Sequence, residues 1–166
     1  DPLDPASRMG AIVDERQTQG IMRFVEAGKR SARLVTGGER VSVDGKGCFV
    51  QPTIFADVTQ DNPLARDEIF GPVLSVISFD TEDQAVAMAN DSIYGLAASV
   101  WTDNLSRACR VADRLHVGTV SVNTVDALSA QTPFGGMKQS GFGRDLSLHS
   151  LEKYTALKTV WIKYRS

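Results

Sequence analysis

The central part of the chain, residues 73–123, alternates short apolar segments with amphipathic ones, and this alternation restricts the fold more than any other feature. Short segments rich in β-branched and apolar residues predict strands. Apolar strands that alternate with helices are typical of parallel sheets covered on both faces. We therefore expect an α/β fold with a parallel βαβαβ sheet. The three predicted strands are Val73–Phe79, Leu96–Trp101 and Thr119–Asn123.

Two amphipathic segments predict the helices between these strands. The first begins at Thr81-Glu-Asp-Gln84, which has the spacing of a capping box, and continues to about Asn90. The second covers Leu105–Leu115, where Thr102 or Asp103 is placed to cap the first turn.

The N-terminal part predicts one long helix among irregular segments. The Pro-rich stretch Asp1–Gly10 predicts a loop, and a helix should follow over roughly Asp14–Ala27, with Gly28 at its end. Leu34–Val35 predicts a short strand that two glycines end. Phe49–Phe55 is extended but contains a proline, which favours an edge or irregular strand.

The C-terminal part predicts a loop, a short helix and a last strand. Ligands of parallel sheets gather beyond the carboxyl ends of the strands. The Gly-rich segment Thr124–Arg144 follows the third predicted strand, so it is the expected wall of a site. A helix over about Asp145–Tyr154 and a strand over Thr155–Tyr164 should follow. We thus expect a main portion over residues 1–154 and a tail strand over residues 155–166.

Charge and composition argue against several partners. The chain carries 18 basic and 20 acidic residues, a net charge of −2, and no basic stripe that would indicate nucleic acid. No apolar run is long enough to span a membrane, so we expect neither partner. Cys48 and Cys109 have neither metal nor disulfide spacing. We expect both thiols to be passive, with Cys109 buried in its helix, and we expect no metal site.

The segment Glu68-Ile-Phe-Gly-Pro-Val73 contains candidate ligand-binding residues. In extended backbone, residues two apart face the same way, so Glu68 and Phe70 could present a carboxylate and an aromatic face to one ligand. A carboxylate can accept two hydrogen bonds from a ribose diol, and a phenyl ring can pack on a flat heterocycle. The residues alone fit equally simple structural roles, a surface glutamate in a salt bridge and a phenylalanine in the core.

The tail over residues 155–166 carries apolar groups on both faces. Leu157 and Trp161 lie on one side of the expected strand, and Val160 and Ile162 lie on the other. A terminal strand of this kind pairs with a sheet edge, either in its own domain or in another subunit.

These features together resemble the C-terminal part of the aldehyde dehydrogenase superfamily, over essentially the whole chain. The order and spacing of the motifs make coincidence untenable. They are Asp1-Pro-Leu-Asp-Pro5, Pro52-Thr-Ile-Phe55, Glu68-Ile-Phe-Gly-Pro-Val73, Asn90-Asp-Ser-Ile-Tyr-Gly-Leu96, Gly118-Thr-Val-Ser-Val-Asn123, and Pro133-Phe-Gly-Gly-Met-Lys138 with Ser140-Gly141.

The resemblance implies an enzyme that oxidises an aldehyde to the carboxylic acid with NAD, or NADP, as cofactor. In that family a cysteine thiolate forms a thiohemiacetal and then a thioester, and a glutamate activates the hydrolytic water. Both residues precede the segment that Asp1 begins to match, so we expect no catalytic cysteine in this chain. The chain alone should therefore show no turnover and little affinity for NAD.

The resemblance also assigns roles to individual positions. Glu68 matches the glutamate that binds the nicotinamide ribose, and Phe70 matches the aromatic residue beside the nicotinamide ring. Leu128 and Phe134 match positions that wall the aldehyde pocket, although many relatives carry an aromatic residue where Leu128 stands. Asp145 stands where many relatives carry a glutamate linked to proton relay, and its shorter side chain puts that role in doubt.

Substrate, assembly and location are further expectations. The loop sequences are most similar to bacterial γ-glutamyl-γ-aminobutyraldehyde and ω-aminoaldehyde dehydrogenases of polyamine breakdown. Asp126 could attract the cationic end of such a substrate, or could be a solvated loop residue. The tail matches the strand that joins subunits of family dimers and tetramers, and a cytoplasmic location is expected. The alternative is a non-catalytic structural or assembly module of the same fold.

Overall fold

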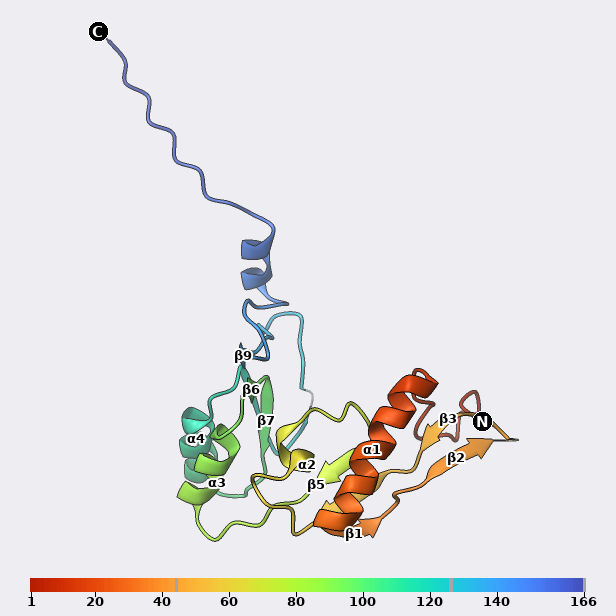
Figure 1. Ribbon diagram of the computed structural model, residues 1–166. Helices are drawn as coiled ribbons and strands as arrows, with labels where there is room; N and C mark the ends of the chain where they lie inside the picture. The colour runs from red at the N-terminus through yellow and green to blue at the C-terminus, as the bar shows by residue number, and fades with distance from the viewer. Residues whose placement is uncertain (44, 126, 166) are drawn as a thin grey trace. The chain divides into compact units, whose positions relative to one another are not determined.

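The computed structural model describes residues 1–43, 45–125 and 127–165, and the chain divides into two compact units, Asp1–Phe79 and Asp80–Ser166 (Figure 1). The helices and strands within each unit follow the α/β pattern that the sequence predicts. No helix in the described part of the chain is long and apolar enough to cross a membrane.

The long helix of the first unit is α1, Glu15–Ser31. It begins at Asp14, whose side chain accepts a hydrogen bond from the Gln17 amide at 2.7 Å. The helix does not end at Gly28 as expected. This glycine is buried inside α1, where an added Cβ would lie 2.8 Å from ring and methyl carbons of Phe55 and Leu64. Its role is therefore to let the helix approach the core closely.

Three strands of the first unit form a sheet in the order β1-β4-β5. The strands β1 (Arg33–Thr36) and β4 (Thr53–Ala56) are antiparallel, whereas β4 and β5 (Val73–Ser75) are parallel. Of the two expected alternatives for residues 49–55, the irregular strand is confirmed, because one strand ends at Val50 and β4 begins at Thr53. The edge position is wrong, because β4 is the central strand of its sheet. The proline stands just before this strand, so its missing N–H removes no ladder hydrogen bond.

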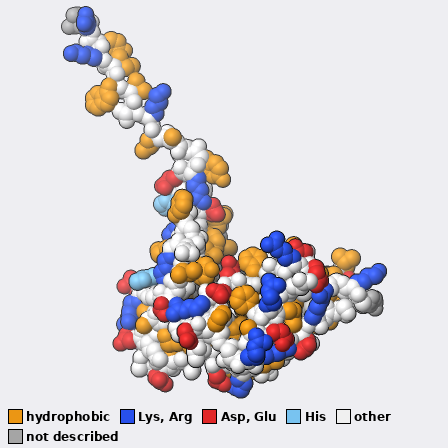
Figure 2. All heavy atoms as spheres, viewed as in Figure 1, with side chains coloured by type: hydrophobic (Ala, Val, Ile, Leu, Met, Phe, Trp, Pro, Cys, Tyr) orange, Lys and Arg blue, Asp and Glu red, His pale blue; other side chains and the backbone are white. Residues whose placement is uncertain are grey.

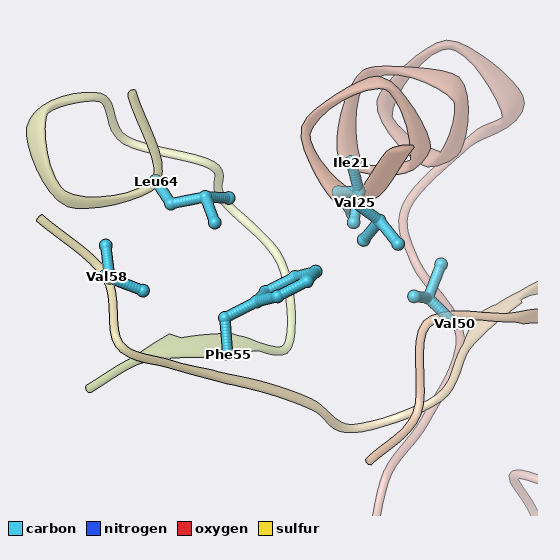
Figure 3. Close-up of a cluster of buried hydrophobic side chains, with 6 residues drawn as sticks. All are labelled: Ile21, Val25, Val50, Phe55, Val58 and Leu64. Atoms are coloured by element: carbon cyan, nitrogen blue, oxygen red, sulfur yellow. The ribbon is translucent and has the colours of Figure 1, made fainter. Parts of the chain in front are cut away.

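Two further strands and a short helix complete the first unit. The strands β2 (Arg40–Val43) and β3 (Lys46–Val50) pair in antiparallel fashion, and α2 (Pro63–Arg66) connects β4 to β5. The core lies between α1, the strands β3 and β4, and α2. Its buried side chains point toward one another in Figure 3, and they are Ile21, Val25, Val50, Phe55, Val58 and Leu64. Removing this apolar surface from water is the main stabilising term for the unit.

The second unit contains the predicted helices and two of the predicted strands. The helix α3 (Glu82–Asn90) begins at Thr81, whose hydroxyl accepts from the Gln84 amide, as the capping box predicts. The strands β7 (Ala97–Val100) and β8 (Thr119–Val122) are parallel and are joined through α4 (Leu105–Arg114). This β-α-β unit confirms the α/β class.

Two details of the predicted βαβαβ arrangement are wrong, namely the single sheet and the cap of α4. The three predicted strands do not share one ladder, because Val73–Ser75 pairs with β4 whereas β7 pairs with β8. The cap of α4 is Asn104, whose side-chain oxygen accepts from the Arg107 amide at 2.9 Å. Thr102 instead supports the cap, because its hydroxyl accepts from the Asn104 amide at 3.2 Å.

Ion pairs hold the helices α3 and α4 together. Glu82 lies 2.7 Å from Arg110, 3.6 Å from Arg107 and 3.7 Å from Arg114. Hydrogen bonding to the Arg110 guanidinium, aided by the charges of all three arginines, lowers the pKa of Glu82. In α4 it is Ala108 that is buried, so Cys109 is exposed rather than buried as expected.

The C-terminal segments are less regular than predicted. Inside the expected loop over residues 124–144, β9 (Met137–Lys138) forms a two-stranded antiparallel pair with β6 (Tyr94–Gly95), which lies just before β7. A 3-10 helix, η1 (Leu148–Lys153), replaces most of the predicted α-helix. Residues 155–165 form no strand in the described chain, because a strand needs a partner ladder and none is paired with them. The expected tail strand is thus absent from the single chain.

Candidate functional site

Glu68 and Phe70 lie in the turn between α2 and β5, not in a strand. Phe70 has a φ of 55°, in the left-handed region that a bulky residue seldom adopts. The argument that an extended backbone places both side chains on one side is therefore wrong. The turn nevertheless leaves both side chains exposed, and the Phe70 ring is 75% accessible. The segment presents a carboxylate and an aromatic face to solvent, which is what the interpretation as a ligand site requires.

A residue that the sequence analysis missed holds the Phe70 backbone in this conformation. The side-chain amide of Gln17, in α1, donates to the Ile69 carbonyl at 3.2 Å and to the Phe70 carbonyl at 3.0 Å. The next residue, Gly71, packs so closely that an added Cβ would lie 2.5 Å from Ile21. Gln17 and Ile21 are four residues apart and therefore share one face of α1. This spacing is the sequence feature that could have indicated that Gln17 lies beside the turn.

The simpler structural interpretation of this segment fails in the described chain. Glu68 makes neither an ion pair nor a hydrogen bond with any described residue. Phe70 lies outside the buried core cluster. A strained backbone that persists beside an unpaired carboxylate and an exposed ring is typical of functional segments.

The second unit brings two other predicted residues together. Phe134 and Asp145 form an isolated antiparallel bridge, in which the Phe134 amide donates to Asp145 at 2.9 Å and the Asp145 amide donates back at 2.7 Å. Arg144 crosslinks the same two arms, because its guanidinium donates to the Gly136 carbonyl at 2.9 Å. The expected loop over residues 124–144 is therefore a tied structure rather than a free coil.

The remaining predicted pocket residues are less constrained. Leu128 is 52% exposed on the same loop. The loop is fixed nearby, where the Ser147 amide donates to the Ala130 carbonyl at 2.9 Å. Asp126, the predicted contact for a cationic substrate, lies outside the described residues. Glu68 and Phe70 belong to the first unit, whereas Leu128, Phe134 and Asp145 belong to the second.

The carboxylate of Asp145 is engaged with a cation. Its Oδ1 atom lies 2.5 Å from Nζ of Lys153, in the 3-10 helix η1. A carboxylate that relays protons must exchange partners during turnover, and this one has a charged partner already. The geometry therefore adds a second reason, besides the shorter side chain, to doubt a relay role for Asp145.

Other candidate sites carry less chemistry. Within the described ranges, no group of three or more His, Cys, Asp or Glu side chains could hold a metal ion. Cys48 is half-buried, and its thiol lies 3.7 Å from the Glu15 carboxylate. An open pocket of about 210 Å³ lies near the N-terminus and contains none of the predicted site residues. Its apolar lining includes Met9, Val41, Val43, Phe49 and Val50.

Comparison with known proteins identifies the family. The sequence pattern of the aldehyde dehydrogenase family matches residues 1–160 of the chain. A betaine aldehyde dehydrogenase from Rhizobium etli is 51% identical over 164 residues, which are 98% of this chain and 34% of that protein. The chain belongs to the aldehyde dehydrogenase family. It spans about a third of the length of the relatives that it matches.

Solved structures agree with this assignment. The P. syringae indole-3-acetaldehyde dehydrogenase, in complex with NAD+ and IAA, is 51% identical, with a TM-score of 0.94, and the match covers 98% of this chain and 33% of that one. The γ-glutamyl-γ-aminobutyraldehyde dehydrogenase from Burkholderia cenocepacia is 57% identical, with a TM-score of 0.91, over 95% of this chain and 32% of that one.

Proposed function

We propose that the full-length protein is an NAD-dependent aldehyde dehydrogenase and that this chain supplies part of its cofactor site and part of its aldehyde pocket. The observation that carries the proposal is the turn at residues 68–70, where an unpaired carboxylate and an exposed ring stand on a strained backbone. A purely structural module has no need of such a turn. The non-catalytic alternative is therefore disfavoured.

The residues of this turn fit a nicotinamide nucleotide. Glu68 would accept hydrogen bonds from the ribose hydroxyls, and Phe70 would pack its ring against the nicotinamide. NAD+, when bound, supplies the hydride acceptor for aldehyde oxidation. The part played by this chain is to orient the nucleotide, since Gln17 and Ile21 hold the turn from one side. NADP remains an alternative cofactor.

The covalent chemistry is proposed to lie in the part of the protein that precedes the matched segment. A cysteine there would attack the aldehyde, and a glutamate would activate water for hydrolysis of the thioester. We expect neither thiol of this chain to take that role, because neither Cys48 nor Cys109 matches the position of the family's nucleophile. The 166-residue chain alone should form no NADH.

The proposed substrate is an aminoaldehyde of the kind produced in polyamine breakdown. The similar proteins named above include dehydrogenases of betaine aldehyde and of γ-glutamyl-γ-aminobutyraldehyde, both of them nitrogen-containing aldehydes. Phe134 and Leu128 would form an apolar wall, and Asp126 would attract the cationic end. If Asp126→Asn leaves the KM for an aminoaldehyde unchanged relative to a neutral aldehyde, the role of Asp126 is wrong.

The cofactor role of Glu68 is tested with full-length protein in which Glu68 is changed to Gln. Loss of hydrogen bonds to a charged group should raise the KM for NAD+ by roughly tenfold or more, while the KM for the aldehyde stays the same. Glu39→Gln is the matched control, because Glu39 is a surface glutamate that pairs with Lys29. An unchanged KM for NAD+ in Glu68→Gln would refute the cofactor role of Glu68. If the unmodified full-length protein oxidises no aldehyde, the proposed dehydrogenase activity is wrong.

A further inference from the structure

The inference concerns Lys153, a residue of η1 to which the family resemblance assigns no role. Its ammonium group lies 2.5 Å from the Asp145 carboxylate, and its side chain is 36% exposed, the lower of the two values in this pair. The lysine stem passes over Gly143, where an added Cβ would lie 2.9 Å from Cε of Lys153. Gly143 also has a φ of 83°, so both the space and the backbone at this position favour glycine.

The ion pair restrains Asp145 and, through it, Phe134, which the proposed function places in the wall of the aldehyde pocket. Asp145 exchanges two backbone hydrogen bonds with Phe134, so whatever fixes Asp145 also fixes the backbone of Phe134. The Arg144 guanidinium reinforces the same contact, because it donates to the Gly136 and Gly143 carbonyls at 2.9 and 2.7 Å. The chain of contacts therefore runs from Lys153 through Asp145 to Phe134.

The backbone between Asp145 and η1 needs this support. Leu146 and Ser147 have φ values of 60° and 52°, two consecutive residues in the left-handed region without a glycine. Such conformations persist only where the surroundings impose them. The constraints here include the hydrogen bond from the Ser147 amide to the Ala130 carbonyl and the hydrogen bonds that Ser147 accepts from His149 and Ser150 at the start of η1. The ion pair that links η1 back to Asp145 is a further constraint.

We propose that Lys153 is a positioning residue, which holds Phe134 and the wall of the aldehyde pocket in place through its ion pair with Asp145 across Gly143. This inference rests on the proposed function for the part that concerns the aldehyde. It makes Asp145 an anchor for the pocket wall and not a mobile proton carrier. The cation is required for the contact, whereas the particular shape of lysine is not.

The test uses the full-length protein with Lys153→Met, Lys153→Arg, Asp145→Asn and the double variant Lys153→Met/Asp145→Asn. The pair is partly exposed, so Lys153→Met should raise the KM for the aldehyde only roughly two- to fivefold, with kcat and the KM for NAD+ unchanged. Lys153→Arg should restore the KM. The double variant should be no worse than Lys153→Met alone, because both changes break one contact.

A second measurement does not depend on activity. The Phe134 and Asp145 amides donate to each other's carbonyls, so Lys153→Met should speed their hydrogen exchange selectively while Lys153→Arg leaves it slow. Lys46→Met is the control, since Lys46 is an exposed lysine of β3 with no ion pair to any described residue.

The outcomes separate the two proposals. Unchanged exchange at Phe134 and Asp145 in Lys153→Met overturns the positioning role, and so does an aldehyde KM equal to that of the unmodified enzyme. Additive effects in the double variant also overturn it. A protein that oxidises no aldehyde, yet shows the selective change in exchange, refutes the proposed function and leaves the positioning role of Lys153 supported.

Discussion

At the scale of single residues, the left-handed backbone at Phe70 is the feature on which the proposed cofactor site depends. A phenylalanine with a φ of 55° is strained, and its neighbours must compensate for that strain. Gln17 does so from α1, through hydrogen bonds to two successive carbonyl groups. The exposed ring is thus held by a residue that lies far away in the sequence and does not need to touch the ligand.

Replacing Gln17 with leucine tests this support. The change keeps the bulk of the side chain but removes the donor, so the turn should relax and the Phe70 ring should lose its fixed direction. A net hydrogen bond contributes about 1 kcal/mol, so the KM for NAD+ in the full-length enzyme should rise roughly two- to tenfold. Gln19→Leu is the control, because Gln19 bonds only to Glu15 on the surface of the helix. Equal values for the two variants would contradict the role of Gln17.

A second residue-scale prediction concerns pH. The Arg40 guanidinium donates to both carboxylate oxygens of Glu15 at 2.7 and 2.6 Å, and together with the Gln19 side chain it lowers the pKa of Glu15 from 4.5 to about 2. Because the pKa is lower in the folded chain, the ion pair stabilises the fold fully above about pH 4.5. That stabilisation is lost as the pH falls toward about 2.

Arg40→Gln should therefore lower the stability modestly at pH 7, have little effect near pH 2 and have none below it. Both side chains are partly exposed, so solvent weakens the interaction. Urea denaturation of the variant and the unmodified protein, repeated from pH 7 downward, measures the difference. A gap between the two proteins that stays constant across this range would show that Arg40 acts through packing and not through the Glu15 charge.

At the scale of elements, the position of α1 depends on a glycine that the sequence pattern misassigns. Gly28 stands in the helix interior, where alanine is the better helix former. Its place against Phe55 and Leu64 reverses that preference, because a Cβ would come within 2.8 Å of both side chains. Helix propensity alone therefore gives the wrong expectation at this position.

Gly28→Ala should destabilise the protein by about 1–3 kcal/mol, as overpacking of a core does. Gly20→Ala in the same helix is the matched case, since an added Cβ there would meet only Arg23 at 3.8 Å. That variant should be more stable by about 0.5–1 kcal/mol. Chemical denaturation measures both, and a stabilised Gly28→Ala protein would mean that α1 can move away from the core at little cost.

The elements also show what the sequence can and cannot predict. The start of the first helix near Asp14, the capping box at Thr81 and the β-α-β unit around α4 follow from local patterns, and these predictions are confirmed. The prediction places β5 in one sheet with β7 and β8, whereas β5 pairs with β4, because the composition of an apolar strand does not specify its partner. The left-handed turn at Phe70 and the bridge from Phe134 to Asp145 depend on contacts between distant segments, which periodicity does not contain.

At the scale of the whole molecule, the tail over residues 155–165 is extended but pairs with no described strand. Hydrophobic side chains, orange in Figure 2, are interspersed with lysine and arginine along residues 155–165, and Leu157 and Trp161 are 106% and 94% exposed. An extended segment with unpaired N–H and C=O groups is a template for pairing with another chain. We propose that the tail forms a strand when a second subunit supplies the edge.

Proline scanning tests this assembly in the full-length protein. Thr159→Pro removes an N–H in the middle of the tail, so a strand formed there should lose a ladder hydrogen bond and the subunits should separate. Arg165→Pro is the control, because residue 165 is in the tail but follows Tyr164, where the strand expected from the pattern ends. Light scattering gives the mass, which should fall to that of a smaller assembly for Thr159→Pro and stay constant for Arg165→Pro. If Thr159→Pro and a variant lacking residues 155–166 both keep the original mass, the subunits associate through another surface, and the exposed apolar groups of the tail must be covered within their own subunit by the part of the protein outside this chain.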